Sequence, residues 1–231
     1  MKCTITLTGN AGVICRCEET VFMVDALHNT PEAYWPWGSF TEKQLEELHA
    51  LYRECRPAAF LFTHRHGDHF TETLAEKAMA EYTAPIYFPG TADKKRGERK
   101  TDSVEMEWME LPHEKEEIHG RENYGFFLSV KGKNFLFAGD CTPGDPRISE
   151  LIMDRPVDVA VLNLNWIGLR NGRRAVQERI RPKHIALVHF PRAEFDHMGY
   201  YQAVSQLSAR FFPEMDIRPM RDYLQTEVFE L

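Results

Sequence analysis

The chain has 231 residues, which is enough for one large domain or two small ones and for a sizeable hydrophobic core. Its hydrophobic (43%) and charged (27%) fractions are typical of a globular protein and exclude collagen, a coiled coil and global disorder. Acidic residues outnumber basic ones by 35 to 28, and the resulting formal net charge of -7 argues against a protein that coats nucleic acid.

The first residues contain no apolar stretch of the kind found in signal peptides. The longest apolar runs, such as residues 58–62 and 185–188, are far shorter than the roughly 20 residues that span a bilayer. The 5 cysteines are an odd number without a CxxC pair, so we expect buried, reduced thiols in a cytoplasmic protein. They are Cys3, Cys15, Cys17, Cys55 and Cys141.

Short β-prone segments open the chain, at residues 4–7, 13–17 and 21–24. After a loop rich in aromatic residues, Thr41 and Gln44 have the spacing of a capping box, which predicts the start of a helix. The next segment, residues 58–62, is a continuous apolar run between a proline and a polar loop. This pattern is typical of a strand buried on both faces.

The rest of the chain continues this interleaving of strands and helices. We expect a helix at residues 71–81 and a charged, solvated loop at 94–102. Further strands are predicted at 104–111, 124–130, 134–138, 157–162, 185–188, 216–218 and 226–229, and further helices near 174–180 and 199–211. No linker rich in Gly, Pro and Ser interrupts the series, so we expect one domain, 1–231, with sheets covered by helices.

The most informative residues follow the buried strand predicted at 58–62. His64, His66, Asp68 and His69 have the spacing H-x-H-x-D-H, and imidazole and carboxylate groups are ligands of zinc and similar divalent metals. Side chains two residues apart in an extended segment point the same way, so His64 and His66 can bind one ion together. Asp68 and His69, beyond the bend at Gly67, can turn toward a neighbouring ion. The alternative, a polar helix cap with solvated histidines, does not account for this coincidence of ligand types.

This H-x-H-x-D-H element resembles the signature of the metallo-β-lactamase fold hydrolases. The resemblance runs from about residue 21 to residue 189 and includes a strand that ends at Asp25, Asp140 in a Gly-Asp pair after an apolar strand, and His189 after a later strand. It implies an α+β fold, a four-layer αββα sandwich of two mixed β-sheets flanked by helices.

The resemblance also implies the ligands of two metal ions. His64, His66 and His119 would hold the first ion, Asp68, His69 and His189 the second, and Asp140 would bridge the two. For the third ligand of the first ion, His119 fits the family arrangement better because it lies just ahead of the predicted hairpin, and His113 is the alternative.

Two further residues near these ligands have open roles. Asp25 is expected to orient the ligand loop through hydrogen bonds, as metal-bound histidines require, or else to be a turn residue at the end of its strand. Cys141 departs from the family pattern, in which a hydroxyl or apolar residue follows the Gly-Asp pair. It is either an oxidation-sensitive thiol near the site or a small buried residue.

The implied function is that of a metal-dependent hydrolase. Two divalent ions, with zinc preferred over manganese or iron, would convert a bridging water to hydroxide near neutral pH. Asp68 and Asp140 would be the catalytic carboxylates, with Asp68 orienting the nucleophile and passing a proton to the leaving group.

The substrate is expected to be a small ester, lactone, thioester or phosphoester, because the chain has the length of the small-substrate members, including the ascorbate-6-phosphate-lactonase-like group. Trp35, Trp37, Asn165 and Arg192 follow predicted strands or ligands and are candidates to line the pocket, although core packing or solvation would also explain them. Neither a membrane nor nucleic acid is an expected partner, and the oligomeric state is not predicted.

Three alternatives remain at this point. A phosphodiesterase or nuclease predicts a basic groove or a substrate-gripping arm. A diiron redox protein predicts iron and a flavin domain, which a separate partner would have to supply. A metal-binding module without catalysis predicts an incomplete ligand set.

Overall fold

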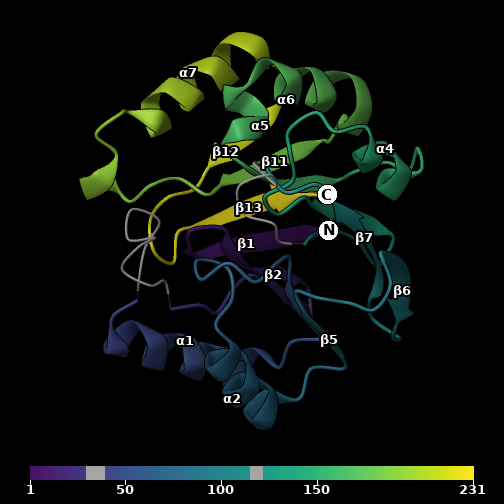
Figure 1. Ribbon diagram of the computed structural model, residues 1–231, viewed down its shortest axis with the longest axis vertical. Helices are drawn as coiled ribbons and strands as arrows, with labels where there is room; N and C mark the ends of the chain where they lie inside the picture. Colours follow the sequence, from purple (N-terminus) through teal and green to yellow (C-terminus); the bar gives the residue numbers. More distant parts are fainter. Residues whose placement is uncertain (30–39, 115–121) are drawn as a thin grey trace.

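Two mixed β-sheets stack face to face in the computed structural model of the protein (Figure 1). The structure describes residues 1–29, 40–114 and 122–231. Within these residues a 6-stranded sheet has the order β13-β1-β2-β3-β4-β5, and a 7-stranded sheet has the order β12-β11-β10-β9-β8-β7-β6. Each sheet combines parallel and antiparallel pairs, as predicted from the family resemblance.

The first sheet consists of β1 (Lys2–Gly9), β2 (Gly12–Cys17), β3 (Thr20–Val24), β4 (Ala59–Phe62), β5 (Ile86–Pro89) and β13 (Thr226–Glu230). The second consists of β6 (Arg96–Lys100), β7 (Glu105–Leu111), β8 (Asn123–Val130), β9 (Lys133–Phe137), β10 (Val159–Asn163), β11 (His184–Val188) and β12 (Asp216–Pro219). The predicted strands are therefore present, with ends that shift by a residue or two.

Helices cover the outer face of each sheet. α1 (Glu42–Cys55) and α2 (Glu72–Tyr82) lie on the first sheet, at the bottom of Figure 1. On the second sheet, at the top, lie α4 (Arg147–Ile152), α5 (Asn165–Gly168), α6 (Arg170–Ala175) with the π-helical turn Val176–Ile180, and α7 (Tyr200–Phe211). None of the helices among the described residues has both the length and the apolar character that crossing a bilayer requires.

Three separate clusters of buried side chains account for the four layers. The first lies between the sheets, where the ring of Phe22 on β3 packs against Phe135 of β9 with centroids 5.1 Å apart. The second joins the outer face of the second sheet to α4–α7, and the third joins the outer face of the first sheet to α1 and α2. This arrangement confirms the predicted αββα sandwich.

Local sequence signals explain the start of α1 and the character of β4. Thr41 and Gln44 form the predicted capping box, in which the Thr41 hydroxyl accepts from the Gln44 amide and the Gln44 side chain accepts from the Thr41 amide. All 4 residues of β4 are buried, as its apolar run predicts for a strand covered on both faces. β4 lies parallel to both β3 and β5, so its end opens at the same edge as theirs.

The prediction of a solvated loop at residues 94–102 is wrong. Residues Arg96–Lys100 form β6, which among the described strands pairs with β7 alone, at the edge of the second sheet. Charged side chains suit an edge strand because they discourage further strand pairing. Gly97 is required here because a Cβ at this position would lie 2.2 Å from the Trp108 ring of β7. The charge that resembled a loop therefore marks an exposed edge.

The expectation of five reduced cysteines is also wrong for two of them. Cys3 of β1 and Cys17 of β2 lie directly opposite each other, with Cα atoms 4.4 Å apart, and form a disulfide. The two cysteines are 14 residues apart in the sequence, and only the register of the β1–β2 hairpin places them opposite each other. Cys15, Cys55 and Cys141 are buried free thiols.

Candidate metal centre

The candidate ligands lie where parallel strands of both sheets end. β3 and β4 are parallel neighbours in the first sheet, and they lead into Asp25 and the H-x-H-x-D-H loop. β9, β10 and β11 are parallel neighbours in the second sheet, and β9 and β11 lead toward Asp140 and His189. Because these ends lie at one edge of the sandwich, residues far apart in sequence meet there.

The structure brings six of the seven predicted ligands together with one further histidine. Two groups have donor atoms that all lie within 4.8 Å of one another: His64, His66, His113 and Asp140 in the first, and Asp68, His69 and His189 in the second. His119, predicted as the third ligand of the first group, lies outside the described residues. His113, the alternative, is the histidine that the structure places in that group.

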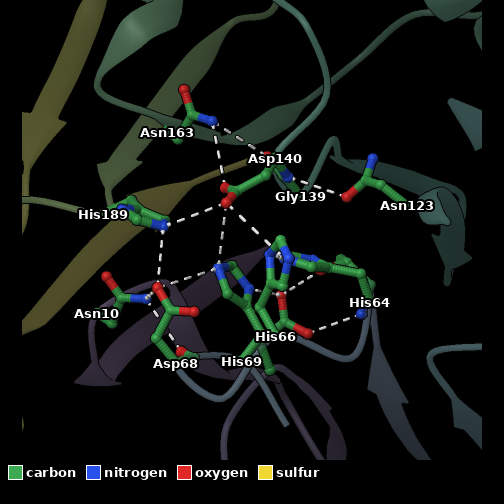
Figure 2. A network of polar contacts seen from close by, with 12 residues as sticks. Asn10, His64, His66, Asp68, His69, Asn123, Gly139, Asp140, Asn163 and His189 are labelled. Carbon is green, nitrogen blue, oxygen red and sulfur yellow. Dashed lines mark hydrogen bonds and ion pairs between the residues drawn. The ribbon is translucent and has the colours of Figure 1, made fainter. Parts of the chain in front are cut away.

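Asp140 lies between the two groups. Its Oδ2 atom is 3.8 Å from His64 Nε2 and 3.7 Å from His113 Nε2 in the first group. The same oxygen is 3.5 Å from His69 Nε2 and 3.4 Å from His189 Nε2 in the second. Figure 2 shows Asp140 approaching from one side, while the residues of the H-x-H-x-D-H loop approach from the other. One carboxylate oxygen thus faces four imidazoles from two groups.

Asp25 orients the loop that carries the first four ligands. Its Oδ1 accepts from the Thr63 amide at 2.7 Å, and its Oδ2 accepts from the Thr63 hydroxyl at 2.7 Å and from His69 Nδ1 at 2.9 Å. Because the Thr63 hydroxyl donates to Asp25, it accepts from His64 Nδ1, 3.0 Å away. Both imidazoles therefore donate from Nδ1 and turn Nε2 toward the centre.

His113 is oriented by the main chain instead. Its Nδ1 donates to the Glu114 carbonyl at 2.6 Å, which leaves Nε2 to face Asp140. His113 pairs with Cys141 in an isolated β-bridge, so the segment just after β7 is held against the segment that carries Asp140. This bridge fixes a histidine that has no recognisable motif of its own.

Three asparagines support the carboxylates of the centre. The Asn10 side chain donates to the carboxylate and to the carbonyl of Asp68, at 3.2 and 3.0 Å, and the main-chain carbonyl of Asn10 accepts from the His189 amide at 3.0 Å. Asn123 Oδ1 accepts from the Asp140 amide at 3.0 Å, and Asn163 Nδ2 lies 3.4 Å from Asp140 Oδ1. Sequence reasoning missed Asn10 and Asn123 as supporting residues. The Gly9-Asn10 turn marks the hairpin, but its contact with Asp68 depends on the fold.

A glycine allows the two sheets to approach each other at the centre. Gly139 has φ +55°, and a Cβ on it would lie 2.4 Å from Asn123 Oδ1 and 2.7 Å from Thr63 Cβ. The Tyr124 amide donates to the Thr63 carbonyl at 2.8 Å in the same place. A side chain at position 139 would therefore push the Asp140 segment away from the ligand loop.

The first sheet's ligands are almost fully buried, whereas Asp140 and His189 remain partly open. Side-chain exposure is 0% for His64 and His69 and 7% for Asp68, but 17% for Asp140 and 12% for His189. Among the described ligands, Asp140 and His189 are therefore the ones that a small molecule can reach most readily.

The electrostatics of the centre favour a cation. Burial lowers the pKa of His64 well below its usual value, and the neighbouring His69 lowers it further. Burial opposes the charge of His69, but Asp140, Asp25 and Asp68 raise its pKa well above the ordinary value. Burial also opposes the charge of Asp140, yet His189 and His69 hold its pKa well below the usual range. Neutral His64 and ionised Asp140 are the metal-binding forms of these groups.

The donor set fits divalent metal ions. His69 Nε2 is buried and has no hydrogen-bond partner among the described residues, although its Nδ1 is bound by Asp25. A buried polar nitrogen left in this state is costly unless a ligand completes it. Imidazole nitrogens with carboxylate oxygens are preferred by zinc, iron and manganese.

The structure places only some of the predicted pocket residues near the centre. Arg192 lines a pocket beside the centre, and Asn165 Nδ2 donates to the Glu114 carboxylate at 2.7 Å. Trp35 and Trp37 lie outside the described residues. Cys141 is fully buried next to the centre, and burial raises the pKa of its thiol. These surroundings favour the interpretation of Cys141 as a small buried residue over that of an oxidation-sensitive thiol.

Solved structures of the same architecture include several metal-dependent hydrolases. A metallo-hydrolase, Igni18, of the archaeon Ignicoccus hospitalis has a TM-score of 0.65 at 16% identity over 100% of both chains. The metallo-β-lactamase fold protein YhfI of Bacillus subtilis has a TM-score of 0.64 at 12% identity over 99% of each chain. An isothiocyanate hydrolase from Delia radicum gut bacteria has a TM-score of 0.62 at 16% identity, also over 99% of each chain. No protein-family model and no curated protein sequence matches the chain.

Proposed function

The chain has the metallo-β-lactamase fold, and on this premise we propose that it is a metal-dependent hydrolase of a small ester, lactone, thioester or phosphoester. The observation that supports this proposal best is the position of Asp140, whose Oδ2 faces His64, His69, His113 and His189 at 3.4–3.8 Å. A single carboxylate oxygen shared by two imidazole groups is suited to bridging two cations.

We assign the ligands by the two groups of donors. His64, His66 and His113 would hold one divalent ion, Asp68, His69 and His189 the other, and Asp140 both. Zinc is the preferred ion because histidine nitrogen dominates the donor set, and iron or manganese are the alternatives. His113 takes the place first given to His119 because its Nε2 already faces Asp140 at 3.7 Å.

The chemistry requires a water-derived nucleophile and a polarised electrophile, and two divalent ions in such a centre supply both. The protein's own contribution is to position groups. Asp25 and Thr63 set the direction of His69 and His64, so the nitrogens of the buried side stay aligned. Asn10 holds the carboxylate of Asp68, 3.7 Å from His189 Nε2. Asp68 can there orient the attacking group and transfer a proton to the leaving group.

The shape of the centre favours a small substrate. The ligands of the first sheet are buried, whereas Asp140 and His189 are partly exposed, which favours an approach of the substrate past these two residues. The pocket beside Asn10 has a volume of about 220 Å³. This is smaller than the roughly 300–1,000 Å³ of pockets that hold drug-sized ligands.

Metal analysis combined with a substrate panel tests the proposal. The purified protein should contain close to two equivalents of zinc and hydrolyse at least one member of a panel of lactones, thioesters and phosphoesters. His66→Ala and Asp140→Ala should lose metal and activity together, whereas His197→Ala, which changes an exposed histidine after β11, should lose neither. Full metal content and full hydrolysis in either ligand variant would overturn the proposal. Iron without hydrolysis would favour the diiron redox alternative.

A further inference from the structure

A pocket of about 220 Å³ lies beside the metal centre. Among the described residues, its lining includes Asn10, Phe40, Phe190, Arg192, Arg221 and Tyr223, and we call it the arginine pocket. It adjoins the centre because Asn10 also donates to the Asp68 carboxylate and Phe190 directly follows His189. A substrate whose reactive bond lies at the metal centre can therefore extend into this pocket.

Arg221 is held in the pocket by packing. Its guanidinium lies 4.3 Å from the centroid of the Tyr201 ring, and its side chain is 24% exposed. Its Nε is buried and has no hydrogen-bond partner among the described residues. The nearest carboxylate oxygen, on Asp222, is 3.7 Å from Nε, and the Asp222 side chain is 75% exposed. The planar guanidinium thus packs on an aromatic ring, while its Nε lacks a hydrogen-bond acceptor among the described residues.

Arg192 provides a second, more exposed cation. It forms an ion pair with Glu194 at 2.5 Å, and the two side chains are 44% and 50% exposed. Exposed ion pairs of this kind are weak and are screened by salt, so an anionic ligand can replace Glu194 as the partner. Glu194 and Asp222 also line this pocket and offset the charge of the two arginines, so an incoming anion must displace these exposed carboxylates from Arg192 and Arg221.

We propose that the arginine pocket binds an anionic group of the substrate, a carboxylate or a phosphate, with Arg221 as the main contact and Arg192 as the second. The inference rests on the proposed function in that the reactive bond of the same substrate lies at the metal centre. Guanidinium groups present paired N–H donors that match both carboxylate and phosphate oxygens. Phe40 and Phe190 add an apolar wall, so the anion is attached to a short body with an apolar face.

Calorimetric titration with inorganic phosphate tests the pocket without a reaction. Arg221→Gln should bind phosphate about 10- to 100-fold more weakly than the metal-loaded wild type, which is the usual scale for losing a hydrogen bond to a charged group. Arg192→Gln should weaken binding less, and Arg221→Lys should recover part of the loss. Arg210→Gln, a change on the exposed side of α7, should bind as the wild type does. Any phosphate bound by the metals contributes equally to all four variants.

Equal phosphate affinity in Arg221→Gln, Arg192→Gln and the wild type would overturn the proposal, as would absence of measurable phosphate binding to the wild type. Circular dichroism shows whether each variant is folded. If Arg221→Gln does not fold, Arg192→Gln and Arg221→Lys decide the outcome, because one change is largely exposed and the other keeps the charge.

Matched substrates separate this inference from the proposed function. Each pair has one ester or lactone with a free carboxylate and one with a neutral carboxamide. The wild type should favour the carboxylate in kcat/KM by at least about tenfold, and Arg221→Gln should lose the preference through KM and leave kcat within about twofold. Hydrolysis without a preference, together with equal phosphate affinities, rejects only the arginine pocket. Absence of hydrolysis rejects the proposed function, and the phosphate titration then still reports on the pocket.

Discussion

The two sheets contribute to the metal centre in different ways. The first sheet supplies four ligand candidates, His64 to His69, from one short loop after β4. The second supplies His113, Asp140 and His189 from three loops that are far apart in the chain. The first side is set by local geometry after one strand, whereas the second depends on how strands β7, β9 and β11 are placed in their sheet.

The two sides also differ in support and in exposure. Asp25 and Thr63 orient the ligands of the first side through side-chain hydrogen bonds, and these ligands are almost fully buried. On the second side, a main-chain carbonyl orients His113, and asparagines contact Asp140, which is 17% exposed. The second side is therefore the more exposed of the two, through Asp140 and His189.

The largest expected effect comes from removing a ligand of the second side. His113→Ala should lower metal content and reduce kcat/KM by roughly 1,000-fold or more, because the nucleophile depends on the metals. His119→Ala is the matched control and should retain both. Inductively coupled plasma analysis and steady-state kinetics on the same samples provide the measurement. Loss of metal in His119→Ala with retention in His113→Ala would reverse the assignment.

Removal of the metal should loosen the contact between the two sides. At a free metal concentration of about 1,000 times Kd, binding stabilises the folded state by about 4 kcal/mol. For a chain of this size, the loss of that contribution lowers Tm by roughly 10 °C. Calorimetry before and after exhaustive chelation measures the shift. Readdition of zinc should restore Tm in the wild type but not in His113→Ala, and an unchanged Tm after complete chelation would contradict the prediction.

A smaller effect is expected when the support of the first side is weakened. Asp25→Asn keeps the size of the side chain but removes the charge that binds His69 Nδ1 and the Thr63 hydroxyl. Loss of such a hydrogen-bond partner costs about 10- to 100-fold in metal affinity. Competition with a fluorescent zinc chelator measures this affinity. Asp158→Asn, at a strand end where Lys183 is its partner at 2.7 Å, is the control and should leave metal affinity unchanged.

The smallest expected effect is a pH dependence of the free energy of unfolding that arises from His28, a buried residue on the first side. Burial lowers the pKa of His28 to about 4, although Asp68 acts in the opposite direction. In the unfolded chain His28 is protonated below about pH 6.5, whereas in the folded state it is protonated only below about pH 4. The stability contributed by neutral His28 is therefore present above pH 6.5 and is lost as pH falls toward 4.

Between pH 7 and pH 5 this group should reduce the free energy of unfolding by about 2 kcal/mol. Urea titrations of wild type and His28→Gln at both pH values measure the difference, and the variant should show a shallower dependence on pH. His197→Gln, at an exposed position, should behave as the wild type. Parallel pH profiles for wild type and His28→Gln would contradict the role of buried His28.

Much of the fold could be predicted because its signals are local. The capping box at Thr41, the apolar run that became β4 and the alternation of strands and helices predicted one domain with sheets covered by helices, and the family resemblance supplied the order of the four layers. β6 was missed because its charged residues resemble a loop when no partner strand is known. The Cys3–Cys17 disulfide was missed because only the register of β1 against β2 places the two residues opposite each other.

The candidate site divides in the same way. By itself, the sequence determined the H-x-H-x-D-H loop, because its ligands are neighbours in one extended segment and a bend, and, through the family resemblance, Asp140 and His189. The tertiary structure alone decided that His113 faces Asp140, that Asn10 holds Asp68, and that Arg221 shares a pocket with Arg192. These contacts join segments that lie 27 to 58 residues apart in the chain. They depend on strand order and on how closely the two sheets approach, and neither leaves a periodic pattern in the sequence.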